Sequence, residues 1–169
     1  VSLTVRAGET EYVFDKVTGV LSSMVQGGKH LISRGPIVTV DRADIDNDMY
    51  KVYDWNNKYF ISNGMGQLEH MEIRQDAAVY IQKYFGCYTQ AWGFRLTYVY
   101  TVHGDGAMDV SLTGTAIRNP EFEPAFLPRI GVELKADRSL RNVAWYGLGP
   151  GENYCDSRQA AIMGVYETD

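Results

Sequence analysis

The amino-acid sequence predicts an all-β protein in which antiparallel strands form two stacked sheets. Twelve Tyr, six Phe and three Trp lie mostly in short runs in which apolar and polar residues alternate. Gly, Asp and Asn separate these runs, and helical periodicity is nearly absent, which is the pattern of strands and turns. About a dozen strands are expected, and that number favours a two-sheet sandwich over a single sheet.

The first forty residues predict a meander of short strands. Tyr12 and Phe14 alternate with polar residues before a turn that ends at Gly19, and Gly27 with Gly28 marks the next turn. Gly supplies the backbone conformations that tight turns need. The expected strands cover residues 12–14, 20–24, 30–32 and 36–40.

A long loop is expected to follow. Four Asp and one Asn fall between Asp41 and Asp48. These side chains bond their own backbone and prefer turns to strand interiors. The aromatic-rich stretch from Met49 to Phe60 shows no regular pattern and is expected to be irregular. Long loops of this kind often carry function.

The rest of the chain predicts regular hairpins. Residues 68–73 and 77–84 are expected to pair around a turn at residues 74–76. The clearest hairpin joins the alternating run 94–102 to residues 108–115 through His103-Gly104-Asp105-Gly106, and its polar positions predict one face open to solvent. Further strands are expected at residues 127–134, 140–146 and 162–166.

The segment from Trp145 to Arg158 reads W-Y-G-L-G-P-G-E-N-Y-C-D-S-R. Its Gly and Pro content predicts a tight, fixed corner, because Gly permits positive φ and Pro restricts φ. In the simplest interpretation Trp145 and Tyr146 end a buried strand, and the polar side chains that follow satisfy loop backbone groups. The alternative is a polar corner at a domain seam or a sugar-facing surface.

Length and charge limit the function classes. A chain of 169 residues suits one domain, residues 1–169. The net charge of −5 and scattered Lys and Arg argue against nucleic acid as a partner. No apolar run approaches the roughly 18 residues of a membrane span, so no membrane partner is expected.

Val1 is not an initiator methionine, and the chain stops at Asp169 after an apolar run, which predicts an excised piece of a longer protein.

No metal site is predicted. Asp44, Asp46 and Asp48 begin like a calcium loop, but Met49 stands where Gly is needed and Trp55 where a bidentate Glu belongs. His30, His70 and His103 lack spaced metal-ligand partners and are expected at the surface. The two cysteines, Cys87 and Cys155, have no metal-ligand spacing and are expected to be idle thiols, with a disulfide between them as the alternative.

The sequence signals for sugar hydrolysis or sugar binding are weak. Glycoside hydrolysis needs two carboxyl groups roughly 5 to 9 Å apart, and the sequence does not indicate such a pair. No nucleophile or phosphate-loop signature occurs. Aromatic rings offer flat apolar faces to a pyranose, so Trp55, Trp92 and Trp145 are the candidates, with core packing as the competing interpretation.

Three motifs in the right order, and a fourth stretch that also fits, resemble the C-terminal β-sandwich of large β-galactosidases of glycoside hydrolase family 2, the small-chain or domain 5 type. The corner from Trp145 to Arg158 is similar to W-x-G-x-G-P-x-E-N-Y-x-D. Pro128 to Gly131 resembles P-R-I-G, and Arg42 to Asp48 resembles R-A-P-x-D-N-D. The stretch from Phe14 to Leu21 fits F-D-x-x-x-G-x-L. The motifs span nearly the whole chain, and the nearest subgroup is the evolved β-galactosidase α-subunit type.

The sequence departs from this family pattern at three positions. Asp44 replaces the usual Pro, Asp41 stands where an aromatic often precedes the Arg, and Tyr50 replaces a frequent Gly. These changes affect the entry to the loop and its expected mobility. The chain also stops short of the family domain's closing strands, which include a tryptophan that reaches the sugar.

The resemblance implies a galactose-mutarotase-like supersandwich attached to a TIM barrel that carries the catalytic glutamates, so no catalytic residue is expected here. The loop from Met49 to Asp54 resembles one at the mouth of the active site. The implied substrate-rim residues are Asp48, Met49, Tyr50, Lys51, Asp54 and Trp55. The family-motif residues are Arg42, Asp46, Asn47, Arg129, Glu152, Asn153, Tyr154 and Asp156.

By the same resemblance, the Mg²⁺ and monovalent cation of the parent family bind in other domains, so no cofactor is expected in this segment. The implied partners are the TIM barrel, the galactoside and further subunits of a homo-oligomer, in a bacterial cytoplasm or periplasm. Two alternatives remain open: an aldose-epimerase-like enzyme, which needs a His and a Glu in one cleft, and a free-standing carbohydrate-binding module, which needs exposed coplanar aromatics.

Overall fold

The computed structural model describes residues 1–74, 78–151, 153 and 158–168. The chain divides into two compact units, Val1–Lys135 and Ala136–Asp169, and their union in one domain over residues 1–169 stays a prediction. The elements of the described residues follow in chain order: β1 (Ser2–Ala7), β2 (Thr10–Asp15), β3 (Val20–Gln26), β4 (Lys29–Thr39), η1 (Asp46–Asp48), η2 (Asp54–Lys58), η3 (Ile61–Asn63), β5 (Met65–Ile73), β6 (Ala78–Cys87), η4 (Tyr88–Gln90), β7 (Trp92–Val102), β8 (Met108–Ile117), β9 (Gly131–Ala136), β10 (Val143–Gly149), η5 (Arg158–Ala160) and β11 (Ile162–Thr168).

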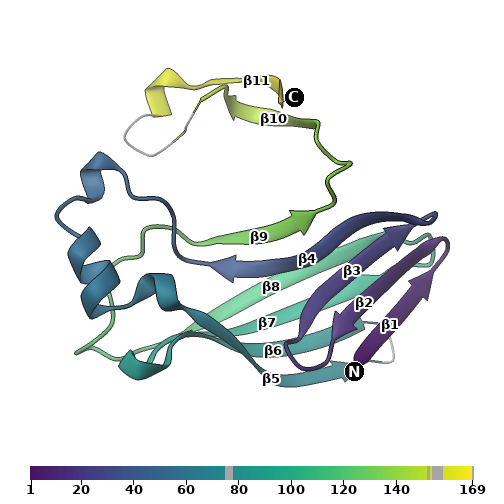
Figure 1. Ribbon diagram of the computed structural model, residues 1–169, viewed down its shortest axis with the longest axis horizontal. Helices are drawn as coiled ribbons and strands as arrows, with labels where there is room; N and C mark the ends of the chain where they lie inside the picture. Colours follow the sequence, from purple (N-terminus) through teal and green to yellow (C-terminus); the bar gives the residue numbers. More distant parts are fainter. Residues whose placement is uncertain (75–77, 152, 154–157, 169) are drawn as a thin grey trace. The chain divides into compact units, whose positions relative to one another are not determined.

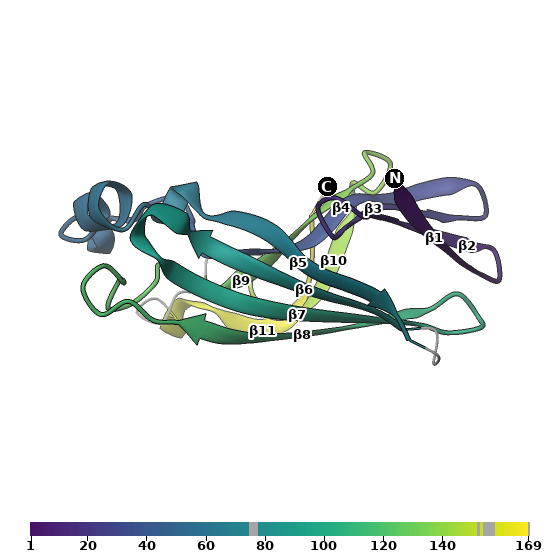
Figure 2. The same ribbon diagram turned by 90° about the horizontal axis from the view of Figure 1, so that it is seen from below.

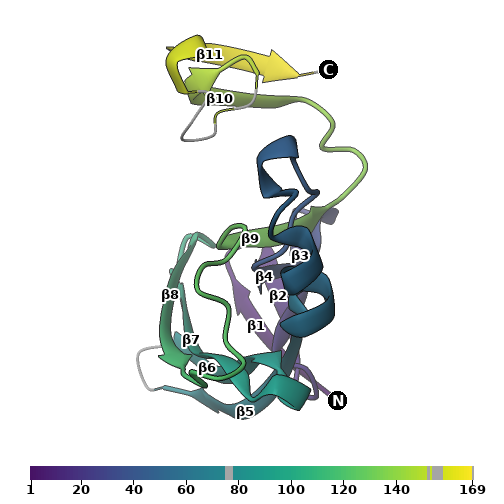
Figure 3. The same cartoon turned by 90° about the vertical axis from the view of Figure 1, so that its left-hand side faces the viewer.

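Two sheets form the first unit, which confirms the predicted all-β, antiparallel sandwich. One sheet has the order β1-β2-β3-β4-β9 and the other the order β5-β6-β7-β8. Figure 1 shows the sheets as two layers with the helical turns at one end of them, and Figure 3 shows the two layers end-on. Figure 2 shows the four strands of the second sheet side by side. The galactose-mutarotase-like topology stays a prediction.

The core lies between the two layers. Alternate residues of β7 point inward, so Leu96, Tyr98 and Tyr100 are buried, as the sequence predicted for residues 94–102. The Tyr100 ring meets Phe14 of β2 edge-on at 5.0 Å, and the Tyr98 hydroxyl accepts a hydrogen bond from the Val38 amide of β4 at 3.2 Å. Aromatic contacts and a buried hydrogen bond therefore tie one layer to the other. The expected polar face of residues 108–115 is exposed.

The prediction of separate strands at residues 30–32 and 36–40 is wrong, because β4 runs unbroken from Lys29 to Thr39. Gly35 makes this continuity possible: its φ is 107°, and a Cβ there would stand 2.6 Å from the Glu133 carbonyl oxygen of β9. Only Gly combines that φ with so close an approach of two backbones. The Gly35-Pro36 pair thus lies inside the longest strand of its sheet.

Other strand boundaries also differ from expectation. The predicted strand 127–134 begins only at Gly131, and the predicted strand 140–146 begins at Val143 and continues to Gly149. The strand β1 was not predicted, although Leu3 and Val5 alternate and pack against the core. The other predicted strands are present with shifted ends. The turn expected at residues 74–76 lies largely outside the described residues.

The connection from β4 to β5 is more regular than the sequence suggested. Residues 46–63 contain η1, the π-helical turn η2 and η3, so the expectation of an irregular stretch from Met49 to Phe60 is wrong. Two backbone hydrogen bonds fix η2, from the Trp55 amide to the Lys51 carbonyl and from the Tyr59 amide to the Asp54 carbonyl, both 2.9 Å long.

Among the described residues, no helix reaches the length and apolarity that crossing a lipid bilayer requires.

The second unit contains the antiparallel pair β10 and β11. Trp145 and Tyr166 lie opposite each other, with ring centroids 5.5 Å apart. A Cβ at Gly149 would stand 2.7 Å from the Tyr166 ring, so this ring requires glycine there. The expectation that Trp145 and Tyr146 end a buried strand is wrong, because β10 continues past them and Tyr146 is 75% exposed.

Candidate functional site

A buried ion pair holds the loop that follows β4. Asp48 accepts two hydrogen bonds from the Arg42 guanidinium, from Nη1 to Oδ2 at 2.6 Å and from Nη2 to Oδ1 at 3.0 Å. The two side chains are only 11% and 9% exposed. A parallel pair of charged hydrogen bonds fixes both distance and orientation. We call Arg42 and Asp48 the loop clasp.

The loop clasp keeps Asp48 ionised. Burial by itself would raise the pKa of the Asp48 carboxyl, but hydrogen bonds from Arg42 and from the Ile45 amide favour the charged form and hold the pKa below its ordinary value. The Asp48 amide in turn donates to the Ile45 carbonyl at 2.9 Å. The same carboxylate therefore closes η1 and anchors Arg42, which is a structural use of its charge.

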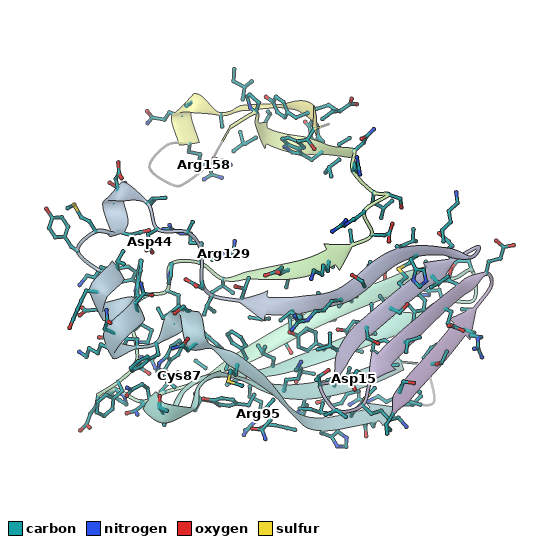
Figure 4. All side chains as sticks on the ribbon, viewed as in Figure 1. Asp15, Asp44, Cys87, Arg95, Arg129 and Arg158 are labelled. Carbon is teal, nitrogen blue, oxygen red and sulfur yellow. The ribbon has the colours of Figure 1, made fainter. Side chains whose placement is uncertain are left out.

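The loop clasp also brings two sequence motifs together. Arg42 Nε donates to the Pro128 carbonyl at 3.1 Å, so the loop at residues 42–48 is tied to the start of residues 128–131. Figure 4 shows Asp44 and Arg129 at the same end of the first unit. The sequence alone does not predict this contact, because the two residues are 86 positions apart. Both motifs thus build one structural corner of the sandwich.

Two tryptophans anchor the helical turns to the core. Trp55 is 5% exposed, donates Nε1–H to the Phe126 carbonyl at 3.3 Å and meets the Phe126 ring edge-on at 5.6 Å. Trp92 is 3% exposed and donates to the Tyr59 carbonyl at 3.0 Å. Core packing, the competing interpretation for these rings, describes their place in this structure. Trp145 is half-buried against Tyr166.

The anchored turns present a set of exposed side chains, which we call the loop platform: Met49, Tyr50, Lys51 and Tyr53. Met49 is 67% exposed, Tyr50 84% and Tyr53 74%. Asp54 is half-buried at the start of η2, whereas Asp48 and Trp55 lie beneath the surface. The structure therefore separates the six predicted rim residues into an outward set and an anchoring set. Large apolar side chains this exposed mark contact surfaces when they cluster.

A groove of about 530 Å³ adjoins this corner. Trp92, Phe126 and Arg129 are among the residues that line it. Arg118 bonds both carboxylate oxygens of Glu123, at 2.8 and 2.9 Å, and these bonds hold the pKa of the Glu123 carboxyl below its ordinary value. The sequence analysis did not identify Phe126, whose carbonyl and ring both contact Trp55. The only signal for it was Trp55 itself, since a large aromatic side chain in a loop needs a packing partner.

The other family-motif residues give less information. Asp46, Asn47, Arg129 and Asn153 are exposed. The remaining three, Glu152, Tyr154 and Asp156, lie outside the described residues, as does Cys155. Cys87 is a free buried thiol beside Thr89, with Sγ and Oγ1 3.2 Å apart. Within the described ranges, no group of three or more His, Cys, Asp and Glu is placed to hold a metal ion.

Among the described residues, His70 and Glu72 form a His–Glu pair of the kind that the epimerase alternative requires. His70 Nε2 lies 3.3 Å from Glu72 Oε2, in a groove of about 550 Å³ at the edge strand β5. The side chains are 51% and 42% exposed, and hydrogen bonds from Arg74 and His70 keep the pKa of the Glu72 carboxyl below its ordinary value. An exposed carboxylate of lowered pKa is a weak general base.

Comparison with known proteins gives a consistent picture. The family model described as "Beta galactosidase small chain" matches residues 6–169. The chain is similar to the β-galactosidase of Clostridium acetobutylicum, with 25% identity over 177 residues that cover 99% of this chain and 18% of that protein. It is 28% identical to the β-galactosidase of Lactobacillus delbrueckii subsp. bulgaricus over 98% of this chain and 16% of that protein.

A third relative, the β-galactosidase of Psychromonas ingrahamii, is 29% identical over 88% of this chain and 15% of its own length. The chain thus spans less than a fifth of the length of these curated relatives. The family match covers the loop clasp, the loop platform and the second unit. This chain belongs to the β-galactosidase small-chain family.

Proposed function

We propose that this chain is a non-catalytic accessory segment of a β-galactosidase, an enzyme that hydrolyses terminal β-D-galactosides. In the proposal the segment packs on a catalytic TIM barrel, and the loop platform forms part of the rim of the active site. The parent enzyme is a homo-oligomer. The family match carries this proposal, together with the small share of each relative that the chain spans.

The electrostatics of the chain agree with a supporting role. A glycosidase needs a carboxyl group of raised pKa as its general acid at neutral pH. Four carboxyl groups in the described part of the chain have a pKa below the ordinary value. These groups are Asp48, Glu72 and Glu123, together with Asp15, whose carboxylate is stabilised first by a hydrogen bond from the Val17 amide.

The loop platform is the part that we expect to meet the sugar or the barrel. Its side chains extend from turns that are fixed by Trp55 and the loop clasp. Because this backbone is already ordered, a contact made there loses little conformational entropy on binding. Asp48 and Trp55, two of the six predicted rim residues, lie beneath the loop platform and hold these turns in place.

Loop variants of the longer enzyme test the proposal. In a β-galactosidase polypeptide that contains this chain, Met49→Ala or Tyr50→Ala is expected to raise KM for nitrophenyl β-galactoside about 3- to 10-fold with kcat nearly unchanged, because a contact equally strong in the ground and transition states is lost. Ile73→Ala, an exposed apolar residue at the far end of β5, is the matched control. Unchanged kinetics in both loop variants would remove the platform from the rim.

A further inference from the structure

The groove of about 530 Å³ beside the helical turns has a mainly apolar lining, and we call it the Arg129 groove. Trp92 is buried in this lining, and its indole N–H is already bonded to the Tyr59 carbonyl. Phe126 and Ile130 also line the groove and are 52% and 71% exposed. Large apolar side chains that are exposed together in a concave surface mark a contact site.

The polar side chains among the lining residues are those of Arg118, Glu123 and Arg129. Arg118 and Glu123 satisfy each other, because Arg118 Nε bonds both oxygens of the Glu123 carboxylate. The Asn119 amide donates to the same carboxylate at 2.9 Å. The lining therefore offers an occupant one further polar side chain, the guanidinium of Arg129.

The Arg129 guanidinium is exposed and forms no ion pair or hydrogen bond with the described residues. Figure 4 labels Arg129 at the end of the first unit that carries the helical turns. Two arginines and one glutamate line the groove, so it is net positive on a chain whose net charge is −5. A carboxylate complements such a site, because its two oxygens match the planar donors of Arg.

Hydrogen bonds fix the walls of the Arg129 groove. The Glu123 amide donates to the Asn119 carbonyl at 2.8 Å, and the Asn119 side-chain amide donates to the Gln90 carbonyl at 2.7 Å. The loop clasp holds the carbonyl of Pro128, the residue directly before Arg129. Because these walls are already ordered, an occupant of the groove would cause little loss of conformational entropy in them.

The lining favours an apolar occupant with one negative charge over a sugar. A sugar carries several hydroxyl groups, and each one that is buried without a hydrogen-bond partner is unfavourable. The groove has one available polar side chain for them, Arg129. A polypeptide segment can instead place an apolar side chain against Phe126 and Ile130 and a carboxylate against Arg129, and Arg is a frequent anchor of such interfaces.

On the basis of the proposed function, we propose that the Arg129 groove receives a segment of the β-galactosidase polypeptide outside this chain. The segment carries an aromatic or branched apolar side chain beside a carboxylate. The apolar side chain covers Phe126 and Ile130, and the carboxylate pairs with Arg129. Because this chain spans less than a fifth of the length of its relatives, most of such an enzyme lies outside it.

Thiol labelling tests this docking site. Ile130→Cys and Val17→Cys each introduce a cysteine at an apolar position of nearly equal exposure, 71% and 72%. Labelling by iodoacetamide is measured in the 169-residue chain and in a β-galactosidase polypeptide that contains it, with the unsubstituted forms as background. Protection is the labelling rate in the chain divided by the rate in the longer polypeptide. We expect protection of about tenfold or more for Ile130→Cys and none for Val17→Cys, in the turn after β2.

Arg129→Glu, combined with Ile130→Cys, tests the charge of the occupant. The substitution places two carboxylates against each other, so the protection of Ile130→Cys is expected to fall several-fold. Lys29→Glu makes the same change of charge at an exposed lysine of β4. As the matched control, Lys29→Glu is expected to leave the protection unchanged.

The proposal is overturned if Ile130→Cys is labelled equally fast in both polypeptides, or if Arg129→Glu leaves its protection unchanged. Protection that arises only after isopropyl β-D-thiogalactoside is added would also overturn it, because the groove would then hold the sugar. A failure of the proposed function is distinguishable from these outcomes, since turnover of nitrophenyl β-galactoside by the chain alone would reveal it.

Discussion

Trp55→Ala is expected to lower the free energy of unfolding of the chain by about 3–5 kcal/mol, the range for large aromatic residues removed from a core. The indole is 5% exposed and packs edge-on against Phe126. Alanine would leave a cavity beneath η2 and would leave the Phe126 carbonyl without its 3.3 Å hydrogen bond. Urea denaturation followed by circular dichroism measures the loss.

Two companion variants separate packing from other effects of the loop. Trp55→Phe keeps an aromatic ring but not the N–H donor, so an intermediate loss is expected. Tyr53→Ala changes an aromatic residue two positions away that is 74% exposed, and a change within about 0.5 kcal/mol is expected there. Equal stability of Trp55→Ala and Tyr53→Ala would show that the indole does not anchor the turns.

Asp48→Ala is also expected to lower the free energy of unfolding by about 3–5 kcal/mol, because it leaves the buried Arg42 guanidinium without its carboxylate. The loss includes the bonds at 2.6 and 3.0 Å to Arg42 and the bond at 3.0 Å from the Ile45 amide. Asp44→Ala, at an exposed aspartate of the same loop, is the matched control. The loop clasp is refuted if both variants unfold at the same urea concentration.

The pH dependence of stability provides an independent check on the loop clasp. The folded pKa of Asp48 lies below the ordinary carboxyl value of 3.8. The contribution of Asp48 to stability is therefore complete above pH 3.8 and is lost as the pH falls through the lower folded value. Asp48→Ala is expected to flatten this acid limb of the stability profile, whereas Asp44→Ala leaves it unchanged.

Local patterns predicted the fold class well because strand alternation is a local property. The run 94–102 alternates so regularly that its buried face was identified residue by residue, and Leu96, Tyr98 and Tyr100 are in the core. Alternation could not predict that Gly35 lies inside a strand, because a close approach to Glu133 of β9 decides it. Tertiary contacts likewise give the aromatic-rich stretch from Met49 to Phe60 its helical turns.

The sequence could predict a loop after the first strands, but it could not predict the contacts that hold this loop. The similarity to known motifs placed Arg42 and Asp48 in one loop, yet the bond from Arg42 to the Pro128 carbonyl joins residues far apart in sequence. Trp55 was predicted at the sugar-facing rim, but the structure places its indole beneath the platform.

Hydrolysis of nitrophenyl β-galactoside by separate polypeptides tests the central proposal most directly. The 169-residue chain, a β-galactosidase polypeptide lacking this segment, and a mixture of the two are assayed after repurification. We expect no turnover by the chain alone, little by the shortened enzyme, and restored turnover by the mixture. Turnover by the chain alone that persists through repurification would contradict an accessory role.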